Sequence, residues 1–157
     1  MVIHTMRSIL PNSNATKFYT FMINPPAEIY NKWLPKEHYE FRIIKHSNRS
    51  PINDLLYFDQ NISNKHRLKF YAIIREANKP NRIVFQMNKY GKNLPGYLEL
   101  DFLDTEEGLA LTETLRIGFN RFGKVCDPFI RIVFNKTFFK DLNEHHKREW
   151  QSLSDIL

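Results

Sequence analysis

The chain has 157 residues, enough for one hydrophobic core, and we assign residues 1–157 to a single domain. Hydrophobic residues make up 42% of the sequence and only five residues are glycine, which excludes a disordered or collagen-like chain. The formal net charge is +6, but lysine and arginine are spread along the chain close to acidic residues. We therefore expect a diffuse basic surface and no nucleic-acid partner.

The sequence predicts neither an export signal nor a membrane span. The first ten residues are too short and too polar for a signal peptide, and no apolar run approaches the roughly 18 residues that a membrane span requires. The single cysteine, Cys126, cannot form an internal disulfide, and we expect it to be a small buried side chain. These features predict a cytoplasmic protein with no membrane partner.

The first third of the chain predicts one strand and one short helix. Residues 1–16 have the composition of a lead-in, and residues 17–24 (KFYTFMIN) are rich enough in β-forming side chains for a first strand. Two prolines end that strand, and residues 27–33 (AEIYNKW) predict a short helix that stops before Pro35. Residues 36–48 predict a turn that enters a strand.

The middle of the chain predicts an antiparallel meander. Short apolar or alternating runs are separated by polar, glycine-containing or proline-containing turns, which is typical of consecutive hairpins. The predicted strands are residues 55–62, 68–76, 82–88, 97–103 and 108–119.

Residues 127–157 predict one long amphipathic helix, with Pro128 in its first turn. His145, His146 and Glu149 fall inside its apolar arc, where a carboxylate costs several kcal/mol unless it is paired, protonated or bound to a cation. His145 and Glu149 are four residues apart and so share one face of the helix. This spacing is one by which a helix supplies two ligands to a metal ion.

The order of these elements predicts an α+β fold. A strand and a short helix precede an antiparallel meander of five or six strands, and a long helix follows. A curved sheet wrapped around that helix would bury its apolar arc and leave a cavity between the two.

This order resembles the helix-grip fold of the START/Bet v1-like (polyketide cyclase, SRPBCC) superfamily over essentially the whole chain. Three stretches also resemble the diacetylphloroglucinol/phloretin hydrolase group: residues 30–41 (YNKWLPKEHYEF), 55–63 (LLYFDQNIS) and 142–157 (LNEHHKREWQSLSDIL). The resemblance implies a zinc-dependent enzyme that hydrolyses a carbon–carbon bond beside a ketone on a phenolic ring.

The resemblance also implies a set of metal ligands. It places a histidine at His38, a strand carboxylate at Asp59, and a histidine and glutamate on the last helix at His145 and Glu149. The strand position stays open, because the glutamate expected in that group aligns either with Asp59 or with Gln60. Zinc suits such nitrogen and oxygen donors best, with iron or manganese as alternatives.

Two further residues are candidates for proton transfer. Glu113 lies on the apolar face of the strand 108–119, where a carboxylate indicates a cavity and is a candidate general base. His146 also lies inside the apolar arc of the last helix and is a candidate proton shuttle or a replacement for His145 as ligand. A hydrogen-bonded core histidine is the more common role for such a side chain.

Two main functions remain open from the sequence, beside a weaker third in which the chain is a structural or partner-binding domain with its cavity filled by phenylalanine side chains. The first is a metal-dependent hydrolase that acts on a small aromatic or β-diketone-type ketone through metal-activated water. The alternative is a metal-free carrier of a hydrophobic small molecule, in which His145 and Glu149 pair with each other or with the sheet. Both predict a hydrophobic or aromatic small-molecule partner, and both leave open whether the chain forms a homodimer.

Overall fold

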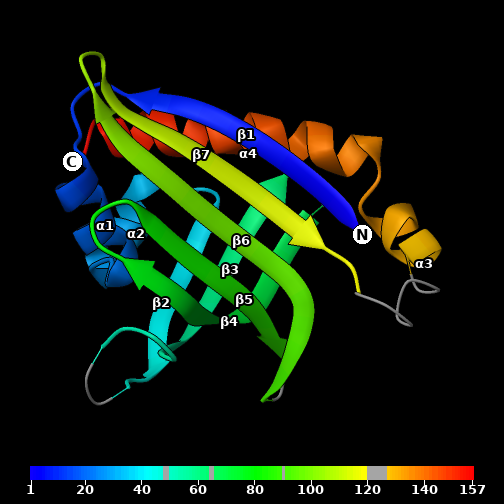
Figure 1. Cartoon of the computed structure of the whole chain (residues 1–157). Helices are drawn as coiled ribbons and strands as arrows, with labels where there is room; N and C mark the ends of the chain where they lie inside the picture. Colours follow the sequence, from blue (N-terminus) through cyan, green and yellow to red (C-terminus); the bar gives the residue numbers. More distant parts are fainter. Residues whose placement is uncertain (48–49, 64–65, 90, 120–126) are drawn as a thin grey trace.

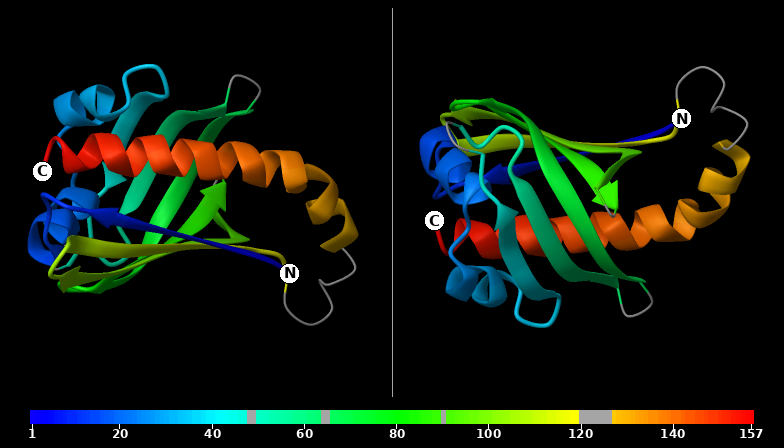
Figure 2. Two further views of the ribbon diagram at one scale, coloured as in Figure 1. Left: turned by 90° about the horizontal axis from the view of Figure 1, so that it is seen from above. Right: turned by 90° about the horizontal axis from the view of Figure 1, so that it is seen from below.

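Seven antiparallel strands form one sheet that curves around a long C-terminal helix (Figures 1 and 2). The computed structural model describes residues 1–47, 50–63, 66–89, 91–119 and 127–157. In chain order the elements are β1 (Val2–Leu10), α1 (Ala15–Ile23), α2 (Ala27–Trp33), β2 (His38–Lys45), β3 (Leu55–Ser63), β4 (His66–Asn78), β5 (Arg82–Lys89), β6 (Lys92–Thr105), β7 (Gly108–Ile117), α3 (Asp127–Val133) and α4 (Lys136–Ser154). The predicted helix-grip fold is confirmed.

The sheet has the strand order β1-β7-β6-β5-β4-β3-β2. Strands β2 to β7 follow one another as hairpins, while β1 pairs with β7 along its whole length, from Val2 opposite Ile117 to Leu10 opposite Leu109. The β2–β3 register sets His38 opposite Gln60. Residues directly opposite each other in an antiparallel pair share a face of the sheet, so His38 and Gln60 lie on the same side.

Helix α4 covers the concave side of the sheet (Figure 2), and α1 and α2 close the end where α4 terminates. Trp150 of α4 packs against Phe18 of α1 and Trp33 of α2, with ring centroids 5.5 and 5.3 Å apart. On the sheet, alternate residues of β7 are buried, as a strand with one covered face requires. Within the described ranges, no helix is long and apolar enough to cross a membrane.

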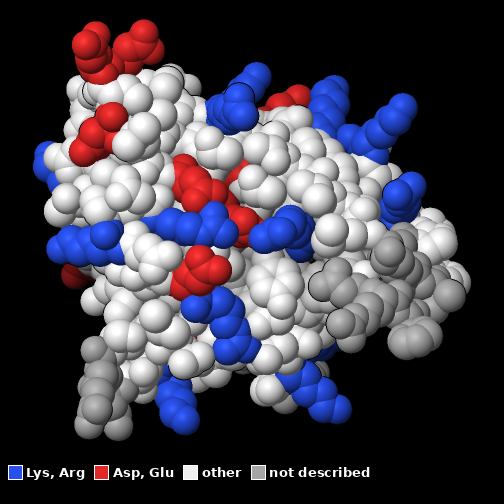
Figure 3. Space-filling view, in the orientation of Figure 1, with Lys and Arg blue, Asp and Glu red and all other residues white. Residues whose placement is uncertain are grey.

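Charged side chains pair on the opposite, convex face of the sheet. Arg82 donates to Asp101 at 2.6 Å and to Glu99 at 3.0 Å, and Arg116 forms an ion pair with Glu99. In Figure 3 lysine and arginine side chains stand among aspartate and glutamate side chains on the visible face. The positive charge is therefore interspersed with negative charge there.

The first predicted strand is wrong. Residues 17–24 lie almost entirely in the helix α1, and residues 2–10, expected to be a lead-in, form β1. Helical spacing lets α1 bury Phe18 and Phe21, three residues apart, while Asn14 caps its first turn by accepting from the Lys17 N–H. These tertiary contacts outweigh the β-propensity of the aromatic and β-branched side chains.

The single C-terminal helix is also wrong in one respect, since it is divided into α3 and α4. The side-chain oxygen of Asn135 accepts hydrogen bonds from the backbone N–H groups of Thr137 and Phe138 at 2.9 and 3.1 Å. An asparagine in this role starts a new helix instead of continuing the old one. The predicted helix at residues 27–33 and the meander are confirmed, with β6 starting earlier than expected, and Cys126 lies outside the described residues.

Replacing Asn135 by alanine should destabilise the protein by about 1 kcal/mol, because the first turn of α4 loses its acceptor. Asn135→Asp keeps an acceptor and adds a negative charge that a helix N-terminus favours, so its stability should stay close to that of the wild type. Urea unfolding measures both variants. An equal loss in both would assign the effect to the bond from the Asn135 amide to the carbonyl of Ile132 instead.

Candidate functional site

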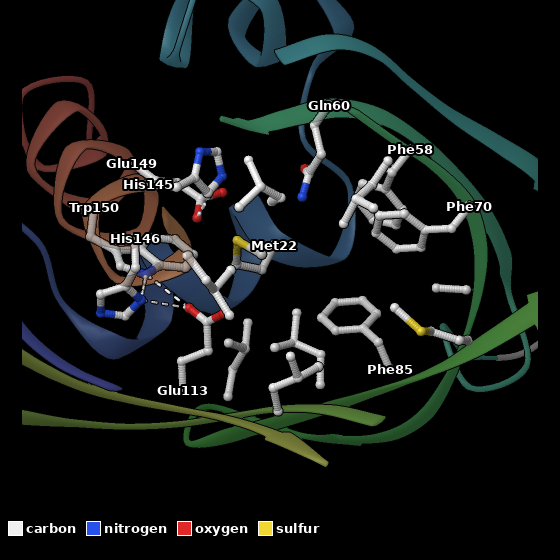
Figure 4. Close-up of a pocket in the computed structure, with 18 of the residues that line it drawn as sticks. Met22, Phe58, Gln60, Phe70, Phe85, Glu113, His145, His146, Glu149 and Trp150 are labelled. Carbon is white, nitrogen blue, oxygen red and sulfur yellow. Dashed lines mark hydrogen bonds and ion pairs between the residues drawn. The ribbon is translucent and has the colours of Figure 1, made fainter. Parts of the chain in front are cut away.

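A cavity of about 110 Å³ lies between the concave face of the sheet and α4. Its wall is mostly apolar and comes from α1, α2, strands β3 to β7 and α4. Figure 4 shows its two ends: Phe58, Phe70 and Phe85 of the sheet at one, and the polar side chains of α4 at the other. The cavity therefore has an aromatic end and a polar end.

Three of the four predicted metal ligands meet at the polar end. His38 starts β2, directly after α2, while His145 and Glu149 lie one turn apart on α4. One potential ligand atom from each of the three lies within 4.8 Å of the others. His38 Nε2 is 3.3 Å from one oxygen of Glu149, and His145 Nε2 is 3.7 Å from the other.

The two histidines of this cluster have ring nitrogens that are available to bind a ligand. Both ring nitrogens of His38 and Nε2 of His145 are buried and make no hydrogen bond of good geometry within the described part of the chain, so the two Nε2 atoms have only their ion-pair contacts with Glu149. An unsatisfied buried polar atom costs about 1–3 kcal/mol, so such nitrogens normally have a ligand. The ring of Tyr30 stacks on His38 at 4.6 Å and that of Trp33 meets its edge at 4.7 Å, which holds the imidazole in place.

Glu37 and Arg148, which the sequence reasoning missed, orient His145. Nδ1 of His145 is 2.5 Å from a Glu37 oxygen, and Arg148 donates to both oxygens of Glu37 at 3.0 and 3.1 Å. Burial alone would raise the pKa of Glu37, but these hydrogen bonds outweigh it and hold the pKa below its usual value. An ionised Glu37 keeps the Nδ1 proton of His145 and leaves Nε2 facing Glu149, as carboxylate–histidine pairs do at metal sites.

Glu149 is ionised as well. Burial alone would raise the pKa of this carboxyl, but the neighbouring His145 and His38 outweigh that effect and lower it. The cluster thus presents one negative charge and two imidazoles at the end of an apolar cavity.

The fourth predicted ligand, Asp59, does not join this cluster. Arg67 donates to both oxygens of Asp59 at 2.8 Å and Lys69 lies at 3.3 Å, so its charge is already neutralised. The next residue, Gln60, lies on the other face of β3, lines the cavity and accepts from the Tyr30 hydroxyl at 3.1 Å. The expectation that Asp59 faces the site is therefore corrected: a neutral amide lies there.

Both predicted proton-transfer residues also line the cavity. His146 Nδ1 and Glu113 Oε2 are 2.8 Å apart, and the indole N–H of Trp150 donates to the same Glu113 oxygen at 3.0 Å. All three side chains are buried. The sequence indicated this position of Glu113 through strand alternation, whereas nothing in the sequence linked it to Trp150.

No protein-family model and no curated protein matches this sequence. Solved structures match the fold. A START superfamily protein from Mycobacterium smegmatis is 14% identical with a TM-score of 0.65, covering 99% of this chain and 97% of its own. The major latex-like protein 151 of Panax ginseng is 10% identical with a TM-score of 0.58, covering 92% and 97%.

The protein Ara h 8.0201 is also similar, at 10% identity and a TM-score of 0.52, covering 92% of this chain and 97% of its own. At such identities the similarity concerns the fold. The helix-grip fold is therefore shared along nearly the whole chain, while the resemblance to the hydrolase group still depends on the quoted stretches alone.

The Asp59 ion pair should make stability depend on pH. Arg67 holds the pKa of Asp59 below its usual value, with burial opposing and Lys69 adding to the effect. A lowered carboxyl pKa stabilises the folded state above about pH 4, and that stability is lost as the pH falls through the folded-state pKa. Asp59→Asn should thus unfold at lower urea than wild type at pH 7, and the difference should shrink below about pH 4. A difference independent of pH would contradict the ion pair.

Proposed function

We propose that the chain binds a small aromatic molecule in the cavity between the sheet and α4. The supporting observation is the cavity itself, which is lined by apolar side chains and has a few polar groups gathered at one end. Small-molecule sites have this composition, because the apolar wall supplies affinity and the polar groups supply orientation. The shared helix-grip fold supports the same proposal at the level of architecture.

The volume limits the ligand. An engineered cavity of about 150 Å³ accommodates benzene, so a cavity of about 110 Å³ limits the ligand to one ring at most. Met22 and Met87 line the wall, and flexible thioether side chains repack more easily than branched ones. We therefore propose one aromatic ring with short substituents as the ligand class.

The polar end of the cavity determines which substituents on the aromatic ring of the ligand are favoured. His145 and Glu149 lie at this end, opposite the phenylalanine rings of the sheet, and Gln60 lies between the two ends (Figure 4). A ring that contacts the phenylalanines would direct a hydroxyl or carbonyl group toward these donors and acceptors. Phenols and aryl ketones fit this arrangement better than purely apolar rings.

A metal-dependent hydrolase is the second candidate, favoured by the cluster of His38, His145 and Glu149. Two imidazoles and one carboxylate are a donor set that catalytic zinc sites use with a further position open. Zinc held there would lower the pKa of a bound water to about 7 and polarise a ketone oxygen. Iron or manganese would suit the same donors less well.

Two observations favour simple ligand binding over the metal-dependent hydrolase. Asp59, the fourth ligand that the resemblance implies, is engaged by Arg67, and Gln60 contributes no charge. No family model supports the hydrolase group. In a hydrolase, Glu113 and His146 would be placed to accept or return a proton within the same cavity.

Filling the cavity should abolish binding. Leu98→Trp places a large ring in the cavity wall, and we expect at least about tenfold weaker binding of 4-hydroxyacetophenone, measured by calorimetry. Leu103→Trp is the matched control, because Leu103 lies on the same strand but is 61% exposed. Equal affinity in both variants would place the ligand outside the cavity, and no binding to the wild type would exclude this ligand class.

Zinc binding is tested by elemental mass spectrometry on untagged protein. Wild-type protein exposed to zinc and then freed of excess should retain about one ion per chain, and His145→Ala and Glu149→Gln should lose it. His46→Ala is the control, since that histidine is exposed and pairs with Asp54 away from the cavity. A metal-free wild type would exclude the hydrolase and leave the ligand-binding proposal intact.

A further inference from the structure

Ser8, His146 and Glu113 form a continuous hydrogen-bonded chain that connects the interior to the surface. Ser8 Oγ of β1 is 2.9 Å from His146 Nε2, and His146 Nδ1 is 2.8 Å from Glu113 Oε2 of β7. His146 and Glu113 are buried, whereas Ser8 is half-buried at the edge of the sheet. Three elements far apart in sequence thus bring a hydroxyl, an imidazole and a carboxylate into line.

The partners of His146 determine where its proton lies. The Trp150 indole nitrogen can only donate, and its N–H is shared between Glu113 Oε2 at 3.0 Å and His146 Nδ1 at 2.8 Å. If Nδ1 carries the proton, both N–H groups donate to the Glu113 carboxylate (Figure 4). Nε2 is then the unprotonated nitrogen and accepts the hydrogen bond from the Ser8 hydroxyl. The Trp150 N–H directed at Nδ1 favours the opposite tautomer, but the charged Glu113 acceptor makes the stronger hydrogen bond with Nδ1 and so favours the tautomer that a general base toward Ser8 requires.

Ser8 is half-buried and borders a groove on the surface. The groove lies between the end of β1 and the last turns of α4, separate from the apolar cavity. Asn12, Lys147 and Gln151 line the same groove and carry N–H groups. Such donors are the kind that stabilise the negative oxygen formed when a carbonyl group is attacked.

We propose that Ser8 is the nucleophile of an acyl-transfer site in this groove, with small carboxylic esters as substrates. Ser8 Oγ attacks the ester carbonyl while its proton passes to His146 Nε2. The carbon–oxygen bond to the alcohol then breaks, and the alcohol leaves with that proton. Water attacks the acyl-serine by the same route, releasing the acid and restoring Ser8.

Glu113 acts in this site as a positioning residue, because it touches only His146 and Trp150 in the chain of contacts. The activity lies beyond the proposed ligand binding, since Ser8 lines the groove and the reaction needs neither a ligand in the apolar cavity nor a metal. Its test is therefore independent of the binding and zinc experiments.

A fluorophosphonate probe, which reacts covalently with activated serines, tests the proposal in the full-length protein. We expect peptide mass spectrometry to find the adduct on Ser8, with no adduct on Ser8→Ala and none on heat-denatured wild type. Ser152→Ala is the matched control: Ser152 is also half-buried, but its hydroxyl donates to the carbonyl of Trp33 instead of pairing with a histidine. It should label at the wild-type rate.

His146→Gln should slow the labelling of Ser8 by about 100-fold or more, the range that general bases contribute. Glu113→Gln should slow it as well while the far-ultraviolet circular dichroism stays unchanged, which separates proton positioning from loss of structure. A wild-type protein that stays unlabelled would overturn the proposal, even if it binds 4-hydroxyacetophenone normally. So would labelling of Ser8 at equal rates in the wild type and in folded His146→Gln.

Discussion

Helix α4 packs on the concave side of the curved sheet with a face that is only partly apolar. The surrounding segments supply the hydrogen-bond and ion-pair partners that the polar side chains of this face require. Trp150 and Leu153 pack into the core, while His145, His146 and Glu149 enter the same low-dielectric space. A buried charge or imidazole without partners destabilises a fold by several kcal/mol. The polar groups supplied by the strands and by the segment after α2 therefore decide whether this helix can pack at all.

The sequence predicted this helix face well, because side chains that repeat every three or four residues report burial directly. Strand alternation likewise placed Glu113 on the inner side of β7. Partners that come from distant segments carry no such signal. Glu37 reaches His145 across 108 residues and Ser8 reaches His146 across 138, and neither contact leaves a periodic trace. The sequence left the strand position open between Asp59 and Gln60, because one step along a strand reverses the face.

The misassigned α1 shows the same limit in the secondary structure. Its aromatic and β-branched residues favour a strand when considered alone, but Phe18 meets Phe102 and Trp150 only from a helix that closes the end of the barrel-like sheet. Local preference amounts to less than about 1 kcal/mol per residue, and burial of one phenylalanine exceeds it. The break at Asn135 was visible in principle, since asparagine is a preferred cap residue.

The pairing of β1 with β7 has a consequence for how the chain comes to be folded. Val2 lies opposite Ile117, so in the described part of the chain β1 pairs with a strand that is synthesised only after β2 to β6. Contacts of such large sequence separation make folding slow. Synthesis from the N-terminus therefore cannot build this domain progressively. The groove that Ser8 lines and the contact between Ser8 and His146 therefore form only once β1 has paired.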